Sequence, residues 1–206
     1  MCCLLNACTS WSSEAPITPI KNIGNLQELS ENNNRPFIYY PSPDNYSVCH
    51  GHTCSEFSFI QLSNIQWQEV EDLFSPTANN AQQEREQIKL AIALLEKFTG
   101  EQAGTHKDRA ENFTDNGLNG QMDCIDEATN STVYLRMLDD AGLLSFHQQA
   151  SRTSRGGLFA PHNTATIIET DSSLRYAVDS WFNDNGEIPA IVPLSQWKKG
   201  WKPESN

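Results

Sequence analysis

The stretch GQMDCIDEATNSTVYL, residues 120–135, decides the fold that the sequence predicts, because it places a cysteine at the start of a long helix. Asp123 is expected as the N-cap residue, and Gly142 follows the last apolar position of the helix. Cys124 is then the first helical residue. The buried stripe is expected at every third or fourth residue: Ile125, Ala128, Thr132, Leu135 and Leu138.

Two opposing influences act on a thiol at this position. The unpaired backbone N–H groups and the positive end of the helix dipole favour the thiolate form of Cys124. The carboxyl groups of Asp123, Asp126 and Glu127 disfavour a thiolate, because like charges repel. The sequence alone does not say whether the pKa of the Cys124 thiol is lowered or raised. A histidine partner would favour the thiolate, and with it a nucleophile.

A later part of the sequence supplies such a histidine. Residues 164–170 and 175–182 are typical of two strands joined by a tight turn. His162 comes just before the first strand, and Asp179 lies in the second. Counting from the turn places Asp179 opposite residues 166–167, so a small change in register would bring it beside His162.

This order of groups resembles the transglutaminase-like superfamily. The resemblance is carried by GQMDC, PHNTATIIE and RYAVDSW, and it covers about residues 118–182. It implies an α+β fold with a papain-like core, in which N-terminal helices are followed by an antiparallel sheet packed on the Cys-bearing helix. It also implies that Cys124 is the nucleophile, His162 the general base and Asp179 the group that orients the imidazole.

Acyl transfer by such a thiol needs hydrogen-bond donors for the oxygen that becomes negatively charged. The backbone N–H of Cys124 is one donor at a helix start. Gln121 is a candidate for the second, because a side-chain amide just upstream of the nucleophile serves in this way in papain-like enzymes. The alternative is that Gln121 is a loop residue that faces solvent.

The stretch CHGHTC, residues 49–54, contains two of the three cysteines in the body of the chain. Three interpretations remain open: a loop closed by a Cys49–Cys54 disulfide, a metal site that also uses His50 and His52, and reduced cysteines in a turn. Four ligands within so short a stretch would not easily reach a tetrahedral geometry. We therefore expect a disulfide there, and no metal ion or other cofactor in the domain.

The N-terminus resembles a bacterial lipoprotein. LNAC, residues 5–8, fills the four positions of a lipobox, in which the cysteine is lipidated, so Cys8 is the lipidation candidate. We expect residues 1–35 to be a lipoprotein-like terminus and flexible tether, and residues 36–206 to form one domain. The expected location is the cell envelope, as a periplasmic or outer-membrane lipoprotein. The alternative is an ordinary N-terminus.

The composition excludes one class of partner. The chain carries 14 basic and 26 acidic residues among 206, for a formal net charge of −12. Binding to nucleic acid needs clustered Lys and Arg side chains to neutralise phosphates, so no nucleic-acid partner is expected. The partner we expect is a peptide or protein substrate, with a lipid on Cys8 as the membrane tether.

The remaining elements are expected from local patterns. The sequence predicts strands over 36–41 and 56–63, a helix capped by Ser63, and a helix over 79–100 that its final glycine ends. Residues 100–120 then form a long loop, a kind of segment that often carries function.

Several other residues are given structural roles. Trp181 is expected to pack over the sheet and to shield the His–Asp pair from water. Trp197 and Trp201 are expected to pack onto the domain from a closing segment. We expect His147 to be a surface residue of a strand, and the arginines of SRTSRGG to lie in a flexible stretch.

Three functions stay open at this stage. The first is a thiol-dependent acyl-transfer enzyme, a cysteine peptidase or transglutaminase-like protein that acts on peptides or proteins at the cell envelope. The second is a catalytically inactive member of the same superfamily that serves as an interaction module of a tethered lipoprotein. The third is a structural protein in which Cys124 is merely buried.

Overall fold

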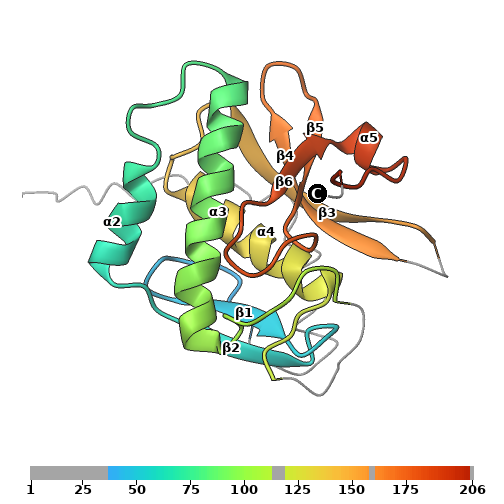
Figure 1. Ribbon diagram of the computed structural model, residues 1–206. Helices are drawn as coiled ribbons and strands as arrows, with labels where there is room; N and C mark the ends of the chain where they lie inside the picture. The colour runs from blue at the N-terminus through green and yellow to red at the C-terminus, as the bar shows by residue number, and fades with distance from the viewer. Residues whose placement is uncertain (1–36, 113–118, 158–160, 205–206) are drawn as a thin grey trace, which may run out of the picture.

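The computed structural model describes residues 37–112, 119–157 and 161–204 (Figure 1). The predicted lipidation at Cys8 and the predicted tether therefore lie outside the described residues. Within them the chain is a mixed α+β fold with two antiparallel sheets and four helices, as the sequence predicts at the level of fold class. Among the described residues, no helix combines the length and apolar character needed to cross a bilayer.

The order of elements starts with a hairpin. The elements are β1 Tyr46–His50, β2 Glu56–Ile60, α2 Asn64–Asp72, α3 Ala81–Ala103, α4 Cys124–Asp140, β3 His147–Arg155, β4 His162–Glu169, β5 Arg175–Asp179, β6 Ala190–Pro193 and α5 Leu194–Trp197. Strands β1 and β2 form one sheet, and β3, β4, β5 and β6 form the other in sequence order. The early β1–β2 sheet is absent from the prediction, which placed only helices and single strands before the cysteine helix.

Helix α4 lies at the centre of the molecule. It packs against β3, β4 and β5 on one side and against β1 and α3 on the other, and Figure 1 shows it passing behind α3 between the two sheets. Every residue from 126 to 138 is buried. The prediction of a single buried stripe is therefore wrong, because α4 is covered on all sides.

Polar residues of α4 are buried with partners. Asn130, for example, accepts a hydrogen bond from the backbone N–H of Cys49 and donates one to its carbonyl, both at 2.8 Å. This pairing satisfies the amide, which would otherwise cost free energy inside the fold. It also fixes the end of β1 against the cysteine helix.

The apolar core joins both sheets to the helices. Val48 of β1, Ile92 of α3, Leu135 of α4 and Ile167 of β4 are all completely buried in one cluster. Burial of such side chains supplies most of the free energy that holds the layers together. The core thereby fixes α4 between its neighbours.

The register of β4 and β5 decides where the predicted site forms. Ala165 pairs with Val178, so the next position along β5, Asp179, falls opposite Thr164. The predicted register placed Asp179 opposite residues 166–167 and was off by two to three residues. In the observed register Asp179 lies nearer to His162 than the prediction placed it.

Several local predictions are wrong. Residues 37–41 are irregular, and the first strand lies at Tyr46–His50 instead. Helix α3 continues through Gly100 to Ala103 and ends at Gly104, whose φ of 79° is the left-handed conformation that glycine adopts readily. The arginine-containing stretch before His162 is part of β3.

His147 is buried, although a surface position was expected. Its Nδ1 lies 2.8 Å from Oε1 of Glu84, and its side chain is completely inaccessible.

The capping predictions are confirmed: Ser63 caps α2 and Asp123 caps α4, each with a reciprocal capping box.

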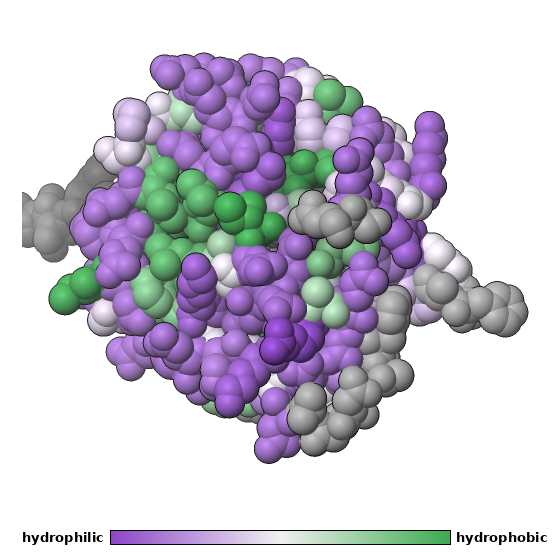
Figure 2. Space-filling model, viewed as in Figure 1, coloured by the Kyte–Doolittle hydropathy of each residue, from purple (hydrophilic) through white to green (hydrophobic). Residues whose placement is uncertain are grey.

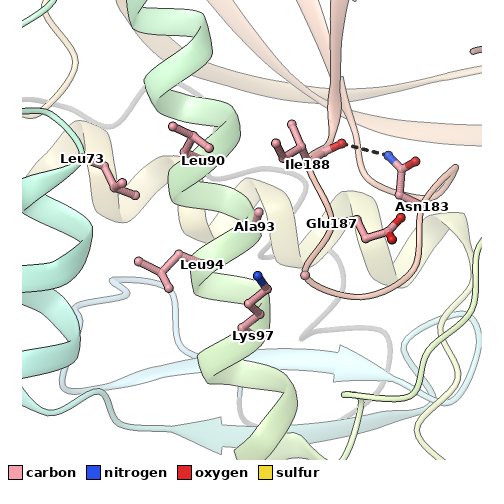
Figure 3. A pocket seen from close by; sticks show the side chains of 9 residues that line it. Leu73, Leu90, Ala93, Leu94, Lys97, Asn183, Glu187 and Ile188 are labelled. Carbon is pink, nitrogen blue, oxygen red and sulfur yellow. Dashed lines mark hydrogen bonds between the residues drawn. The ribbon is translucent and has the colours of Figure 1, made fainter.

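An apolar groove of about 600 Å³ opens on the face of the molecule seen in Figure 2. Figure 3 shows its walls, which are helix α3 and the loop that follows β5, with Leu90 and Ile188 facing each other across it. The loop is held by a hydrogen bond of 3.0 Å from Asn183 Nδ2 to the carbonyl of Ile188. Neither the predicted nucleophile nor the histidine and aspartate line this groove.

Candidate active site

Cys124 is the first residue of α4, and its neighbours shape the helix start. The carboxylate of Asp123 accepts hydrogen bonds from the backbone N–H groups of Ile125 and Asp126, at 2.9 and 3.0 Å. Asp126 in turn accepts the N–H of Asp123 at 3.2 Å. The N–H of Cys124 makes no hydrogen bond to any residue in the described part of the chain, so this donor is available for a ligand.

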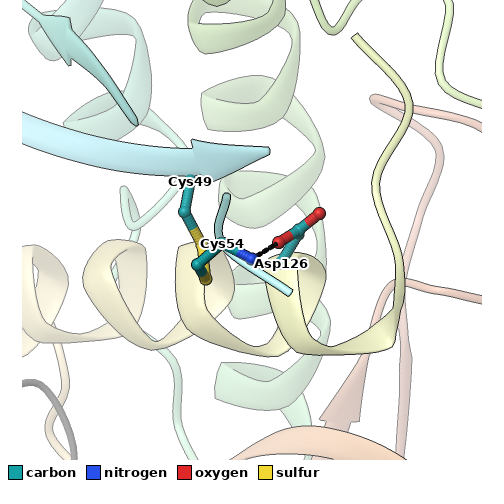
Figure 4. A group of neighbouring side chains, drawn as sticks. All are labelled: Cys49, Cys54 and Asp126. Atoms are coloured by element: carbon teal, nitrogen blue, oxygen red, sulfur yellow. Dashed lines mark hydrogen bonds between the residues drawn. A yellow bond between two sulfur atoms is a disulfide. The ribbon is translucent and has the colours of Figure 1, made fainter. Parts of the chain in front are cut away.

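A disulfide between Cys49 and Cys54 closes the loop that covers this helix start. The backbone N–H groups of His52 and Cys54 donate to the two carboxylate oxygens of Asp126, at 2.8 and 2.6 Å. Figure 4 shows Asp126 beside the two sulfurs. The loop thus holds a carboxyl group that lies two residues from Cys124.

The backbone of this loop is left-handed over four consecutive residues. Their φ values are 76°, 65°, 54° and 54°, for Gly51, His52, Thr53 and Cys54. Such a run turns successive N–H groups inward and forms a concave anion-binding nest. Here the nest binds carboxylates of the protein itself, since Thr53 also donates to Asp123 at 3.0 Å.

The sequence leaves a metal site open as one interpretation of the stretch at residues 49–54. Among the described residues, the one group whose potential ligand atoms lie close together is Cys49, Cys54 and Asp126. Both sulfurs are bonded to each other and cannot act as thiolates in this form. Burial, followed by repulsion from Asp123, raises the pKa of Asp126 to about 7.

His162 and Asp179 meet as the resemblance implies. Nε2 of His162 lies 2.7 Å from Oδ2 of Asp179, and both residues are almost completely buried. An ionised carboxylate only accepts hydrogen bonds, so the proton of this pair resides on Nε2. Nδ1 then carries the free lone pair, and it is buried without a hydrogen-bond partner in the described residues.

The charge state of His162 is set by two opposing effects. Burial lowers the pKa of its imidazole, because it disfavours the charged ring. The hydrogen bond to Asp179 and the interaction with Cys124 raise it, and together they outweigh burial, so the pKa lies above its ordinary value of 6.5. Trp181 and Phe182 pack against both the imidazole and Cys124, so the two residues share one aromatic environment.

The sulfur of Cys124 has two polar neighbours from β4 and the residue before it. Sγ lies 3.8 Å from the carbonyl oxygen of Pro161 and 3.8 Å from Nδ2 of Asn163. Trp181 and Phe182 pack against the same side chain, which is 8% exposed. The thiol is thus free and largely buried.

Trp197 is the site residue that sequence reasoning missed. Its indole N–H donates to Oδ2 of Asp179 at 2.6 Å, the oxygen that also accepts from His162. The sequence signalled only a tryptophan in a closing segment, because the contact joins α5 to the end of β5. The two donors together hold the carboxylate in one orientation.

Aromatic rings enclose the imidazole on several sides. The ring centroids of Trp181, Phe182 and Trp197 lie 4.6, 5.3 and 5.4 Å from that of His162. Trp181 packs over the histidine, where the sequence analysis expected it. Excluding water from the His–Asp hydrogen bond strengthens it.

Arg155 completes the outer wall of the site. Its guanidinium lies 4.4 Å from the centre of the Trp197 ring and donates to the Trp197 carbonyl. This cation–π contact ties the end of β3 to α5. The arginine is therefore ordered against Trp197 and does not lie in a flexible stretch.

Gln121 is placed differently from the expected oxyanion donor. Its Nε2 donates to the carbonyl of Lys107 at 2.9 Å, and its Oε1 accepts from Asn112 at 2.7 Å. The side chain is buried, so the alternative that it faces solvent is wrong. In this structure the amide connects the loop before α4 to residues 107–112.

Three buried carboxyl groups lie behind the site. Glu127 of α4 is hydrogen-bonded to Asp108, and Glu96 of α3 lies near both. Burial is the main cause that raises the pKa of Glu96 to about 7 and of Asp108 to about 6, and it raises that of Glu127 well above its ordinary range. Glu127 is accordingly the protonated member, and it donates to Asp108.

No family model, curated protein or solved structure matches this chain. The function is therefore inferred from the geometry of the site.

Proposed function

We propose that this protein is a thiol-dependent acyl-transfer enzyme, a cysteine peptidase or transglutaminase-like protein that acts on peptide or protein amides. One observation carries the proposal. His162 is buried with Nε2 2.7 Å from Oδ2 of Asp179, and Sγ of Cys124 lies 3.8 Å from atoms of both residues that flank the histidine, Pro161 and Asn163. A base oriented by a third group beside a helix-start thiol is the arrangement that nucleophilic catalysis uses.

The arrangement of elements supports a papain-like core. The nucleophile begins a central helix, and that helix packs on an antiparallel sheet whose neighbouring strands carry the histidine and the aspartate. The positions follow the order expected for the transglutaminase-like superfamily: helix-start cysteine, strand-start histidine, aspartate on the next strand. This arrangement of elements supports the assignment of the three roles.

The reaction would run in two stages. Nδ1 of His162 accepts the thiol proton, and the thiolate of Cys124 attacks the carbonyl carbon of the substrate. When the tetrahedral intermediate collapses, the carbon–nitrogen bond breaks, and the imidazolium returns its proton to the leaving amine. Water or a second amine then attacks the thioester, which releases the acyl group and restores the thiol.

Acylation by an activated ester tests the proposal. With p-nitrophenyl acetate, we expect a burst of nitrophenolate equal to the enzyme concentration, and an acetyl group on Cys124 in peptide mass spectra. Cys124→Ala should abolish the burst, and His162→Ala should slow it by about 10²-fold or more, because general-base catalysis is lost. A wild-type protein that shows no burst and no acetyl adduct would refute the proposal.

One observation favours a second candidate, a catalytically inactive interaction module. The Cys124 thiol has the Pro161 carbonyl as a hydrogen-bond acceptor at 3.8 Å. Nδ1 of His162, by contrast, has no hydrogen-bond partner among the described residues. An inactive protein would leave the thiol in this state and would react with p-nitrophenyl acetate no faster than a free cysteine. The burst experiment therefore separates the two candidates.

The cell envelope is the proposed location, as a lipoprotein tethered through Cys8. LNAC at residues 5–8 and the predicted tether up to residue 35 support it. Metabolic labelling with an alkyne-bearing fatty acid should mark the wild-type chain and leave Cys8→Ala unlabelled. Equal labelling of the two chains would contradict lipidation at this cysteine.

A further inference from the structure

The site has one free backbone donor for a developing oxyanion and needs a second. The N–H of Cys124 makes no hydrogen bond to a described residue, as shown above. Two donors are the usual minimum for stabilising the tetrahedral intermediate of acyl transfer. The amide of Gln121, which the sequence suggested, is bonded to Lys107 and Asn112 instead.

Asn163 presents a donor at the right place. Its Nδ2 lies 3.8 Å from Sγ of Cys124, and no other side-chain nitrogen in the described ranges donates a hydrogen bond to that sulfur. The side chain is half-buried, so a bound substrate can reach it. The amide has no further hydrogen bond to a described residue, which leaves it free to turn toward a ligand.

Asn163 follows His162 in β4, and the two side chains leave the strand in different directions. Successive side chains of a strand point to opposite faces. Ala165 and Ile167, which have the same parity as Asn163, are buried in the core that contains α4. Asn163 therefore approaches the sulfur from the α4 face, while the His162 ring packs against Trp181 and Phe182, which also contact Cys124.

We propose that Asn163 is a catalytic residue, the second oxyanion donor beside the N–H of Cys124. When Sγ bonds to a carbonyl carbon, the carbonyl oxygen lies about 3 Å from the sulfur. Nδ2 can then transfer its hydrogen bond from the sulfur to that oxygen as the negative charge moves there. The inference rests on the proposed acyl transfer and adds to it the residue that stabilises the intermediate.

Two reactions of the same thiol test the assignment. Acylation by p-nitrophenyl acetate passes through an oxyanion, whereas alkylation by iodoacetamide displaces iodide and forms none. Both are measured on the full chain with the variants Asn163→Ala and Asn163→Leu. The matched control is Ser154→Ala, since Ser154 is exposed and pairs with Asn163 across the β3–β4 ladder.

Acylation and alkylation should separate in the Asn163 variants. We expect the acylation rate to fall about 10²-fold while the alkylation rate stays within about twofold of wild type, because only the first reaction needs the donor. The preserved alkylation also shows that the variants are folded. The control should match wild type in both reactions.

Three results would overturn the assignment. Equal losses in both reactions would mean that Asn163 only stabilises the thiolate. Unchanged acylation would mean that another group, such as Gln121, supplies the donor, which Gln121→Ala would then reveal. A wild-type protein that alkylates but never acylates would refute the proposed function, and the role of Asn163 with it.

Discussion

The indole nitrogen of Trp197 lies 2.6 Å from Oδ2 of Asp179, the same oxygen that accepts the hydrogen bond from His162. The carboxylate is thus held by two donors, one from α5 and one from β4. A hydrogen bond to a charged, buried acceptor contributes more to stability than one between neutral groups. The short helix α5 therefore takes part in positioning the His162–Asp179 pair.

Trp197→Phe removes this donor and keeps an aromatic ring in the core. We expect the free energy of unfolding to fall by about 2 kcal/mol, measured by urea denaturation. Alkylation of Cys124 should also slow, because the carboxylate is less firmly oriented. Trp201→Phe is the matched control, since Trp201 is half-buried and contacts Phe182 rather than Asp179. Equal alkylation rates in both variants would contradict a positioning role.

Asp179→Asn tests what sets the charge state of His162. The carboxylate raises the pKa of the imidazole, through a hydrogen bond and through its charge. A neutral amide removes the charge, so burial should then dominate and lower the pKa of His162. NMR titration of ring-labelled histidine measures the change, with His106, an exposed histidine, as the internal reference. An unchanged His162 pKa would show that Asp179 does not control it.

The buried carboxyl groups predict a pH dependence of stability. Glu96 and Asp108 have raised pKa values of about 7 and about 6, so the folded chain keeps protons that the unfolded chain releases near pH 4. The folded state therefore binds more protons than the unfolded state between about pH 4 and about pH 7, so the free energy of unfolding falls as the pH rises through this range. For Glu96 alone the loss is on the order of 3 kcal/mol.

Glu127→Gln isolates one member of this group. Glutamine cannot ionise, so the variant should gain thermal stability at pH 8 relative to wild type and gain little at pH 5. Circular dichroism melting curves at the two pH values measure both effects. Glu69→Gln, on the exposed face of α2, serves as the control. The same gain at both pH values would mean that the proton on Glu127 does not matter.

The disulfide loop predicts a link between stability and reactivity. The double variant Cys49→Ser/Cys54→Ser should lose about 2 kcal/mol of unfolding free energy, as expected for opening a loop of this length. It should also slow alkylation of Cys124. The N–H groups of the loop hold the carboxyl group of Asp126, and without them its negative charge would disfavour the thiolate more strongly. Cys124→Ser keeps the disulfide and should retain wild-type stability. An unfolding free energy unaffected by the double variant would contradict the role of the loop.

Local signals in the sequence were enough to predict that α4 begins after Asp123 and that the side chains of His162 and Asp179 lie together. Asp123 is followed by a regular helix, and the turn between β4 and β5 is short, so both depend on neighbouring residues. The register error of two to three residues arose because a turn fixes register only when its type is known. The α+β class was implied by the resemblance that these motifs carry, and the structure agrees at that level.

Long-range contacts explain what the sequence did not reveal. Strand β3, HQQASRTSR, lacks the alternation of apolar residues that signals a strand, and it is stabilised by pairing with β4. His147 is buried because Glu84, far away in the sequence, supplies its partner. The contacts of Trp197 with Asp179 and of Asn163 with Cys124 are also long-range, because they depend on how α5 and α4 pack against the sheet.

The central claim is that His162 activates Cys124, and the rate of alkylation of Cys124 by iodoacetamide at neutral pH tests it most directly. Wild-type protein should react at least about 10²-fold faster than His162→Ala, because the general base is lost in the variant. His106→Ala, which removes an exposed histidine, should react like wild type. Equal rates in wild type and His162→Ala would contradict the account.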